Sequence, residues 1–144
     1  MDISKNMLAP AAVLILWTLV MVGWTAVARF GAFAKIGVNL KGAAPGGRGQ
    51  DLEGVLPPKA NWKSHNYTHL MEQPTIFYAT ALVLALAGLG HGLNAYLAWG
   101  YVGLRVVHSL VQATTNIILL RWALFMVGSL VLLVLAIRAA MGVF

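Results

Sequence analysis

The sequence predicts an all-α integral membrane protein, a bundle of four transmembrane helices in a single domain that covers residues 1–144. Hydrophobic residues make up 60% of the chain, and the mean hydropathy is +0.78, more than a soluble domain of this size can bury. Apolar runs long enough to cross a bilayer recur along the chain. The excess apolar surface is therefore expected to face lipid.

Three apolar runs have the length that a hydrocarbon core requires, about 20 residues. They cover residues 8–28, 74–93 and 122–144. We expect helices at about 7–29, 65–92 and 121–143, the second of which reaches upstream of its apolar run into the cytoplasm.

A fourth run, residues 95–120, is continuous and free of proline but more polar. Its polar residues recur at intervals of three, four and four, which marks one stripe of a helix. We expect a helix at about 95–119 whose stripe faces protein or water, since lipid tails cannot satisfy these groups. The stripe consists of Arg105, His108, Gln112 and Asn116.

Positive charges concentrate on the side of the membrane that holds the loop 30–64 and the turn before the fourth helix. The terminal side has only Lys5 and Arg138. By the positive-inside rule, we expect the loops to be cytoplasmic and both termini to lie outside. The loop 30–64 is rich in glycine and proline, so we expect it to be irregular. The basic residues of the loop side are Arg29, Lys35, Lys41, Arg48, Lys59, Lys63 and Arg121.

Composition also excludes some functions. The net charge of +6 does not indicate nucleic-acid binding, because the bases lie beside apolar runs instead of forming a patch with interleaved aromatics. The chain has no cysteine, which excludes disulfides and thiolate metal clusters. Any reactive thiol must therefore come from a bound molecule.

The second and third predicted helices both carry a polar stripe. His65, His69 and Glu72 recur at intervals of four and three, which would put them on one helical face. Glu72 is the sole acidic residue inside a predicted span, and an unpaired charge there costs at least about 2.5 kcal/mol. At a rise of about 1.5 Å per residue, Glu72 comes level with Arg105 and His108. We therefore expect Glu72 to pair with Arg105 in a shared polar interior.

Two other readings of this stripe stay open. The ion pair could serve only helix packing, as interhelical polar contacts often do. A metal site is the other reading, because His-x-x-x-His-x-x-Glu offers three ligands and His108 a fourth. However, His65 would lie about 10 Å from Glu72 along the helix, a span that a single ion would struggle to bridge, and no metal ligand is included among the predicted site residues.

Two tracts resemble the MAPEG proteins, the membrane-associated proteins of eicosanoid and glutathione metabolism. The first is His65-Asn66-Tyr67-Thr68-His69-Leu70-Met71-Glu72-Gln73-Pro74, and the second is Tyr101-Val102-Gly103-Leu104-Arg105-Val106-Val107-His108-Ser109-Leu110. Arg121 opens the fourth predicted helix at a matching position, so the resemblance covers most of the chain.

The resemblance implies a homotrimer that binds glutathione between subunits near the cytoplasmic face, while a lipophilic substrate arrives from the bilayer. Glu72 would hold the amino group of glutathione, supported by Arg105, and Arg29 and His108 would contact its other polar groups. Arg121 would be catalytic, because a guanidinium beside a thiol favours the thiolate nucleophile. The other expected cofactor-binding residues are His65, His69 and Gln112.

The leading hypothesis is thus a glutathione-dependent transferase or peroxidase of the bacterial inner membrane, acting on a lipophilic electrophile or hydroperoxide. The alternative is a non-enzymatic accessory or structural subunit that keeps the fold, within a larger membrane complex. Loss of activity on changing Arg121 separates the two.

Overall fold

The structure, a computed structural model, describes residues 4–37, 42 and 45–144, and every element in this part of the chain is helical. This confirms the predicted all-helical class. The elements are α1 (Lys5–Ile36), the 3-10 helix η2 (Gly49–Leu52), α2 (Pro58–Leu70), α3 (Gln73–Leu86), α4 (Leu93–Thr114) and α5 (Ile118–Met141).

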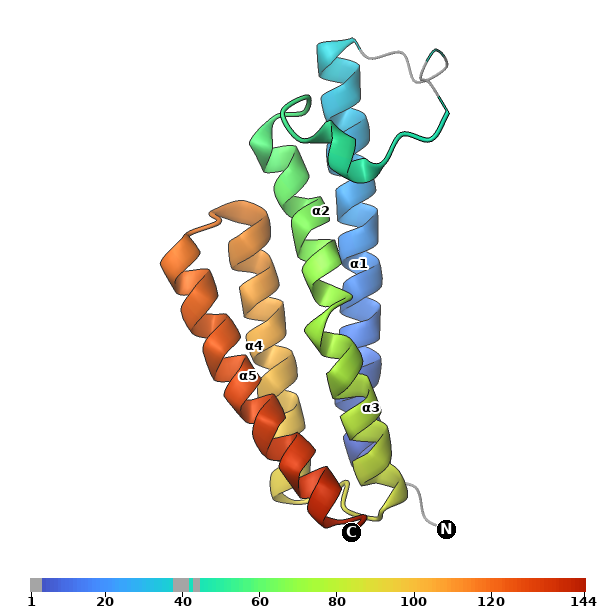
Figure 1. Cartoon of the computed structure of the whole chain (residues 1–144), viewed down its shortest axis with the longest axis vertical. Coiled ribbons are helices and arrows are strands. Elements are labelled where there is room, and N and C mark those ends of the chain that lie inside the picture. Colours follow the sequence, from blue (N-terminus) through green and yellow to red (C-terminus); the bar gives the residue numbers. More distant parts are fainter. Residues whose placement is uncertain (1–3, 38–41, 43–44) are drawn as a thin grey trace.

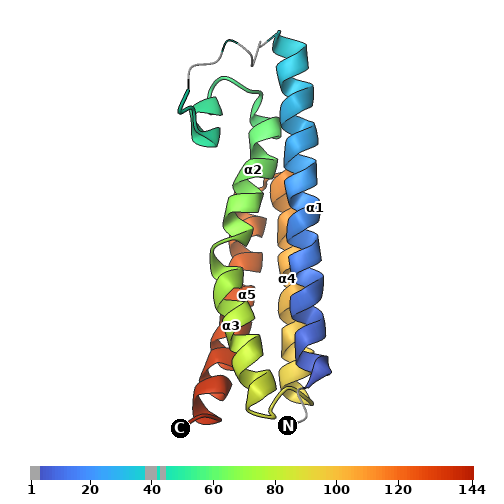
Figure 2. The same ribbon diagram turned by 90° about the vertical axis from the view of Figure 1, so that its right-hand side faces the viewer.

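The helices run side by side along the long axis of the molecule (Figures 1 and 2). The helices α2 and α3 follow each other end to end and both pack against α1, while α4 contacts α1, α2 and α5. At one end of the bundle, the Ser4 hydroxyl donates a hydrogen bond to the Gly90 carbonyl at 2.7 Å, and Gly142 lies against Leu89. The two ends of the described chain therefore lie on the same side, as the topology prediction requires.

Apolar side chains both fill the core and cover the outside. The buried cluster draws on every long helix and includes Met7, Leu14, Met21, Phe77, Leu84, Tyr101 and Leu135. Large apolar side chains such as Leu16, Leu19, Ile118 and Leu119 are exposed. Within the described residues, α1 and α5 are the two helices long and apolar enough to cross a membrane by length and composition. Their outward-facing apolar side chains are those of a lipid-facing surface.

The predicted helix 65–92 is wrong in both its bounds and its continuity. The chain begins α2 already at Pro58, breaks the helix at Met71 and Glu72, and ends α3 at Leu86. Pro74 stands in the first turn of α3. A proline lacks the backbone N–H, and its ring collides with the carbonyl four residues earlier, which here belongs to Leu70, the last residue of α2.

The first predicted helix and the loop 30–64 also need correction. The helix α1 runs to Ile36 instead of residue 29 and ends at Gly37, which has φ 70° and whose N–H donates to the Phe33 carbonyl. The region predicted as an irregular loop therefore holds the end of α1, η2 and the first half of α2. Lys41, counted among the cytoplasmic bases, lies outside the described residues.

The turn between α4 and α5 lies earlier than predicted. The helix α4 spans Leu93–Thr114 instead of 95–119, and α5 begins at Ile118 instead of 121. Asn116 has φ 52°, a left-handed conformation that asparagine tolerates better than most residues, and its N–H donates to the Val111 carbonyl at 2.7 Å. Asn116 is thus a turn residue and does not extend the polar stripe of α4.

Candidate functional site

The largest fully buried side chain in the described part of the bundle is that of Arg105, on α4, which is only 1% exposed. Its Nη2 donates to the His69 carbonyl at 2.9 Å and contacts His69 Nδ1 at 3.1 Å. Because α2 ends at Leu70, the His69 carbonyl has no helical partner of its own. Arg105 therefore caps the end of α2, and since a guanidinium only donates, Nδ1 of His69 accepts and the neutral ring carries its proton on Nε2.

The His69 ring stacks on His108 with a centroid distance of 4.9 Å and an interplanar angle of 17°. Phe125 of α5 covers both rings, at 5.2 Å from His69 and 6.5 Å from His108. His108 Nδ1, like Nε and Nη1 of Arg105, is buried without a hydrogen-bond partner in the described part of the chain. The sequence predicted that these residues share a polar interior, and the structure places them together. We call Arg105, His69 and His108 the deep cluster.

A second network of buried hydrogen bonds lies beside the deep cluster. Of its members, only Gln112 was predicted from the sequence as a site residue. Asn66, fully buried on α2, donates from Nδ2 to Gln112 Oε1 at 3.0 Å. Its Oδ1 accepts from the Ser109 hydroxyl at 2.8 Å. Asn66 lies three residues before His69 and Ser109 four after Arg105, so helical spacing alone could have identified both. The amide thus ties α2 to α4 with both of its polar atoms.

A further missed contact joins the start of α3 to α4 and α5. Gln73 donates from Nε2 to the Ser129 hydroxyl at 2.7 Å and accepts from the Tyr101 hydroxyl at 3.2 Å. Gln73 directly follows the helix break, where its side chain turns into the bundle. The residue that turns outward is its neighbour, Glu72.

The predicted Glu72–Arg105 ion pair does not form within the subunit. Across the described residues, the one ion pair within 4.0 Å joins Glu53 to His65, and Glu72 is exposed. The cause is the break before Pro74, because a face drawn on a continuous helix does not continue through it.

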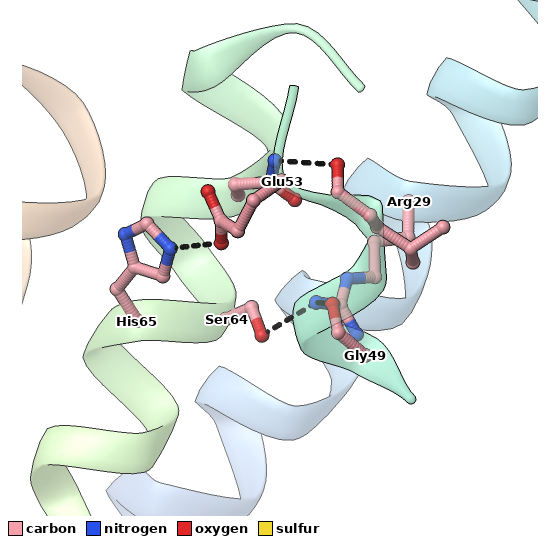
Figure 3. Close-up of polar contacts among 7 residues, drawn as sticks. Arg29, Gly49, Glu53, Ser64 and His65 are labelled. Carbon is pink, nitrogen blue, oxygen red and sulfur yellow. Dashed lines mark hydrogen bonds and ion pairs between the residues drawn. The ribbon is translucent and has the colours of Figure 1, made fainter. Parts of the chain in front are cut away.

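The remaining predicted ligands, Arg29 and His65, line a separate groove between α1, α2 and the segment that contains η2, and Figure 3 shows the polar contacts there. The Arg29 Nη2 donates to the Gly49 carbonyl at 2.9 Å and to the Ser64 hydroxyl at 2.8 Å. His65 contacts Glu53 through Nε2. The groove has a volume of about 560 Å³ and combines an apolar floor, including Val22, Ala26 and Phe33, with these polar groups.

The surroundings of this groove are positively charged. Lys63, next to Ser64, lies with its ammonium 5.7 Å from the centre of the Trp24 ring. Partial burial and then the charge of Lys59 lower the pKa of Lys63 below its ordinary value. Together with Arg29, these lysines make this end of the bundle a region that favours anionic ligands.

A protein-family model described as the MAPEG family matches residues 7–141. The chain belongs to the MAPEG family. Searches of curated proteins and of solved structures found no match. The matched span contains α2 to α5, all but the first two residues of α1, the deep cluster and the groove. Membership therefore applies to the whole site and makes this MAPEG chain an integral membrane protein.

In this MAPEG chain the expected catalytic residue, Arg121, occupies the first turn of α5 and is half-buried. Its Nη1 donates to Asn116 Oδ1. The left-handed turn at Asn116 thus has a direct structural consequence, since it brings an amide oxygen against the guanidinium. The catalytic role of Arg121 stays a prediction.

The side chains of the metal reading do not come together in the part of this MAPEG chain that the structure describes. His65 turns toward Glu53, whereas His69 stacks on His108. Among the described residues, no group of three or more histidine, aspartate and glutamate side chains comes together as a metal site requires. The helix break that turns Glu72 away from Arg105 also keeps the Glu72 carboxylate away from the histidines.

Proposed function

We propose that this protein is a membrane-bound, glutathione-dependent transferase or peroxidase that acts on a lipophilic electrophile or hydroperoxide at a subunit interface of a homotrimer. The observation that carries the proposal is the MAPEG match over residues 7–141 together with buried guanidinium and imidazole donors that lack partners of their own. Such donors are typical of a site that a polar ligand completes.

The proposal includes four membrane crossings, by α1, by α2 and α3 together, by α4 and by α5. The helix α4 has 22 residues, about 33 Å by helical rise, which matches a hydrocarbon core of about 30 Å. Its polar stripe, from Arg105 to Gln112, is buried, and its outward face carries Val107 and Leu110. The glycine- and lysine-bearing region between α1 and α2 would then lie in the cytoplasm of a bacterial cell, with the membrane being the inner one.

The position of Glu72 supports the subunit interface of the proposed trimer. The helix α3 has 14 residues, so Glu72 lies about 21 Å from its outer end, inside the hydrocarbon layer. An exposed carboxylate in lipid costs at least about 2.5 kcal/mol. A neighbouring subunit and a bound ammonium group would both remove that cost, which supports an interface site.

The chain offers the charges that glutathione requires. The tripeptide carries two carboxylates and one ammonium group, and the site region supplies Arg29, Arg105 and Arg121 as cations and Glu72 as the anion. Guanidinium groups suit carboxylates because their donors match both oxygens. His65, His69, His108 and Gln112 complete the proposed set of binding residues.

Arg121 is the proposed catalytic residue. Bound glutathione supplies a thiol that conjugates to an electrophile or, as two molecules, reduces a hydroperoxide to an alcohol and water. The permanent charge of Arg121 favours the thiolate and thereby increases its nucleophilic fraction. The hydrogen bond to Asn116 fixes the orientation of this guanidinium.

The proposal predicts that the protein in lipid nanodiscs conjugates glutathione to chlorodinitrobenzene or reduces a lipid hydroperoxide. Arg121→Ala should reduce turnover at least about tenfold through loss of thiolate, with unchanged thermal unfolding. Arg138→Ala, at the opposite end of the same helix, is the matched control and should retain activity. Absence of glutathione binding at millimolar concentration would overturn the proposal.

A second candidate function is that of a non-enzymatic subunit within a larger membrane complex. The hydrogen bonds of Asn66 and Arg105 favour it, because they join α2 to α4 without any ligand. This candidate predicts that Arg121→Ala leaves function unaltered and that a stoichiometric partner copurifies.

A further inference from the structure

The cytoplasmic segment 48–56, which contains η2, crosses the groove at Arg29, and we call it the strap. Figure 3 shows the strap beside α2, with Arg29 between them. Three polar contacts hold it: Arg29 to the Gly49 carbonyl, Asn61 Nδ2 to the Leu52 carbonyl at 3.1 Å, and Glu53 to His65. The strap therefore forms one side of the groove, next to Arg29 and His65.

The strap occupies one edge of the Arg29 guanidinium. Nη2 donates hydrogen bonds to the Gly49 carbonyl and the Ser64 hydroxyl. Nε of Arg29 is buried without a partner in the described ranges. Nε and Nη2 together form the edge that a carboxylate binds with both oxygens. A neutral carbonyl and a hydroxyl thus stand where a carboxylate would bind more strongly.

The strap approaches Arg29 as closely as a glycine allows. A Cβ atom built on Gly49 would lie 2.8 Å from Arg29 Nη1, too close for any other residue unless the guanidinium moves. By contrast, a Cβ on Gly47, just before the strap, would meet nothing within 4 Å. The close approach is specific to the position whose carbonyl binds Arg29.

The strap is only weakly anchored to the helices. Its buried apolar contacts are limited to Leu56, with partly buried Leu52, against Ala32, Ala60 and Phe33. The Glu53 and His65 side chains are 50% and 45% exposed. Segments with few buried contacts and exposed polar contacts open locally at low free-energy cost.

We propose that the strap is a built-in competitor for Arg29: its Gly49 carbonyl occupies the guanidinium in the ligand-free protein and releases it when a carboxylate ligand binds. This inference rests on the proposed function, because glutathione is the carboxylate ligand that the site would take. The apparent affinity is then the intrinsic affinity multiplied by the fraction of molecules in which the strap has released Arg29. The strap thereby sets how much glutathione the protein needs.

Locking the strap tests the proposal in one direction. The chain has no cysteine, so the double variant Glu53→Cys, His65→Cys carries two unique thiols where the side chains now touch. A short bis-maleimide forms a thioether bridge that glutathione cannot reduce. Isothermal titration should show glutathione binding at least about tenfold weaker after cross-linking than before, because the closed state does not release Arg29.

Loosening the strap tests it in the other direction. Gly49→Ala should break the contact with Arg29 and tighten apparent glutathione binding by about threefold or more, while the control Gly47→Ala should bind like the parent. Hydrogen exchange of the strap amides should accelerate in Gly49→Ala, and in the parent on addition of glutathione.

The outcomes separate this inference from the proposed function. Equal glutathione affinity in the cross-linked and open forms, or unchanged strap exchange on binding, overturns the strap inference and leaves the proposed function standing. Absence of glutathione binding in the parent, Gly49→Ala and open double variant overturns both.

Discussion

Arg105 and Arg29 both donate to a backbone carbonyl, yet they occupy opposite environments. Arg105 lies in the bundle and caps the end of α2 through the His69 carbonyl. Arg29 lies at the groove between α1 and α2 and binds the strap through the Gly49 carbonyl. The first acceptor belongs to a packed helix and the second to a weakly anchored segment. Two arginines that are both predicted from sequence to bind a ligand can therefore differ in how tightly they are held. The difference lies in whether the group that accepts their hydrogen bond belongs to a packed helix or to a weakly anchored segment.

This difference assigns separate roles to the two regions. The deep cluster and the Asn66 network hold α2 against α4 and so define the frame of the site. The groove contains the cation that can change partners without disturbing that frame. Stability should depend mainly on the first region, while the exchange of partners that accompanies ligand binding takes place in the second.

The largest expected contrast is between the two arginines themselves. Arg105→Ala should lower the free energy of unfolding by about 3 kcal/mol, because it leaves a cavity and an unpaired buried carbonyl. Arg29→Ala should cost less than about 1 kcal/mol, since its contacts lie near the surface. Thermal unfolding in nanodiscs measures both, and equal losses would break the comparison.

A matched pair of buried amides on α2 gives the next contrast. Asn66→Ala should destabilise the bundle by about 1–3 kcal/mol, because it leaves Gln112 and Ser109 without their buried partner. Asn61→Ala removes only a bond to the strap and should instead raise hydrogen exchange in residues 48–56. If Asn61→Ala lowered global stability as much as Asn66→Ala, the strap would be part of the frame.

The smallest effect is expected for Glu53→Gln. The contact with His65 is exposed, and such pairs contribute about 0–1 kcal/mol. Global unfolding should not change measurably, while exchange of the strap amides should increase. Asp51→Asn offers a comparison within η2, because Asp51 accepts only from the Arg48 N–H of its own turn. A greater increase in Asp51→Asn than in Glu53→Gln would show that His65 does not hold the strap.

Sequence reasoning succeeded where helical periodicity continues without interruption. The spacing along α4 put Arg105, His108 and Gln112 on one buried face, and this is confirmed. It failed at Pro74, where a local steric effect ends one helix and starts another and turns Glu72 outward. It failed also at Asn116, where a left-handed turn shortened α4. The spacing of polar residues does not reveal such helix breaks. The conformational preferences of the proline and the asparagine have to be considered before a helical face is extended across them.

The groove could not have been predicted from sequence. The contact of Arg29 with Gly49 depends on how a glycine-rich segment folds back, which no helical repeat specifies. Arg29 itself was found only through its family resemblance. Asn66 and Ser109, in contrast, were within reach of the helical spacing that found their neighbours.

The most direct test is a titration of glutathione into the parent protein and Arg29→Gln, both in lipid nanodiscs and both checked for thermal unfolding. The account predicts binding at millimolar or lower concentration by the parent, at least about tenfold weaker binding by Arg29→Gln, and equal unfolding temperatures. Equal glutathione affinity in the two proteins, or no binding by the parent, would contradict it.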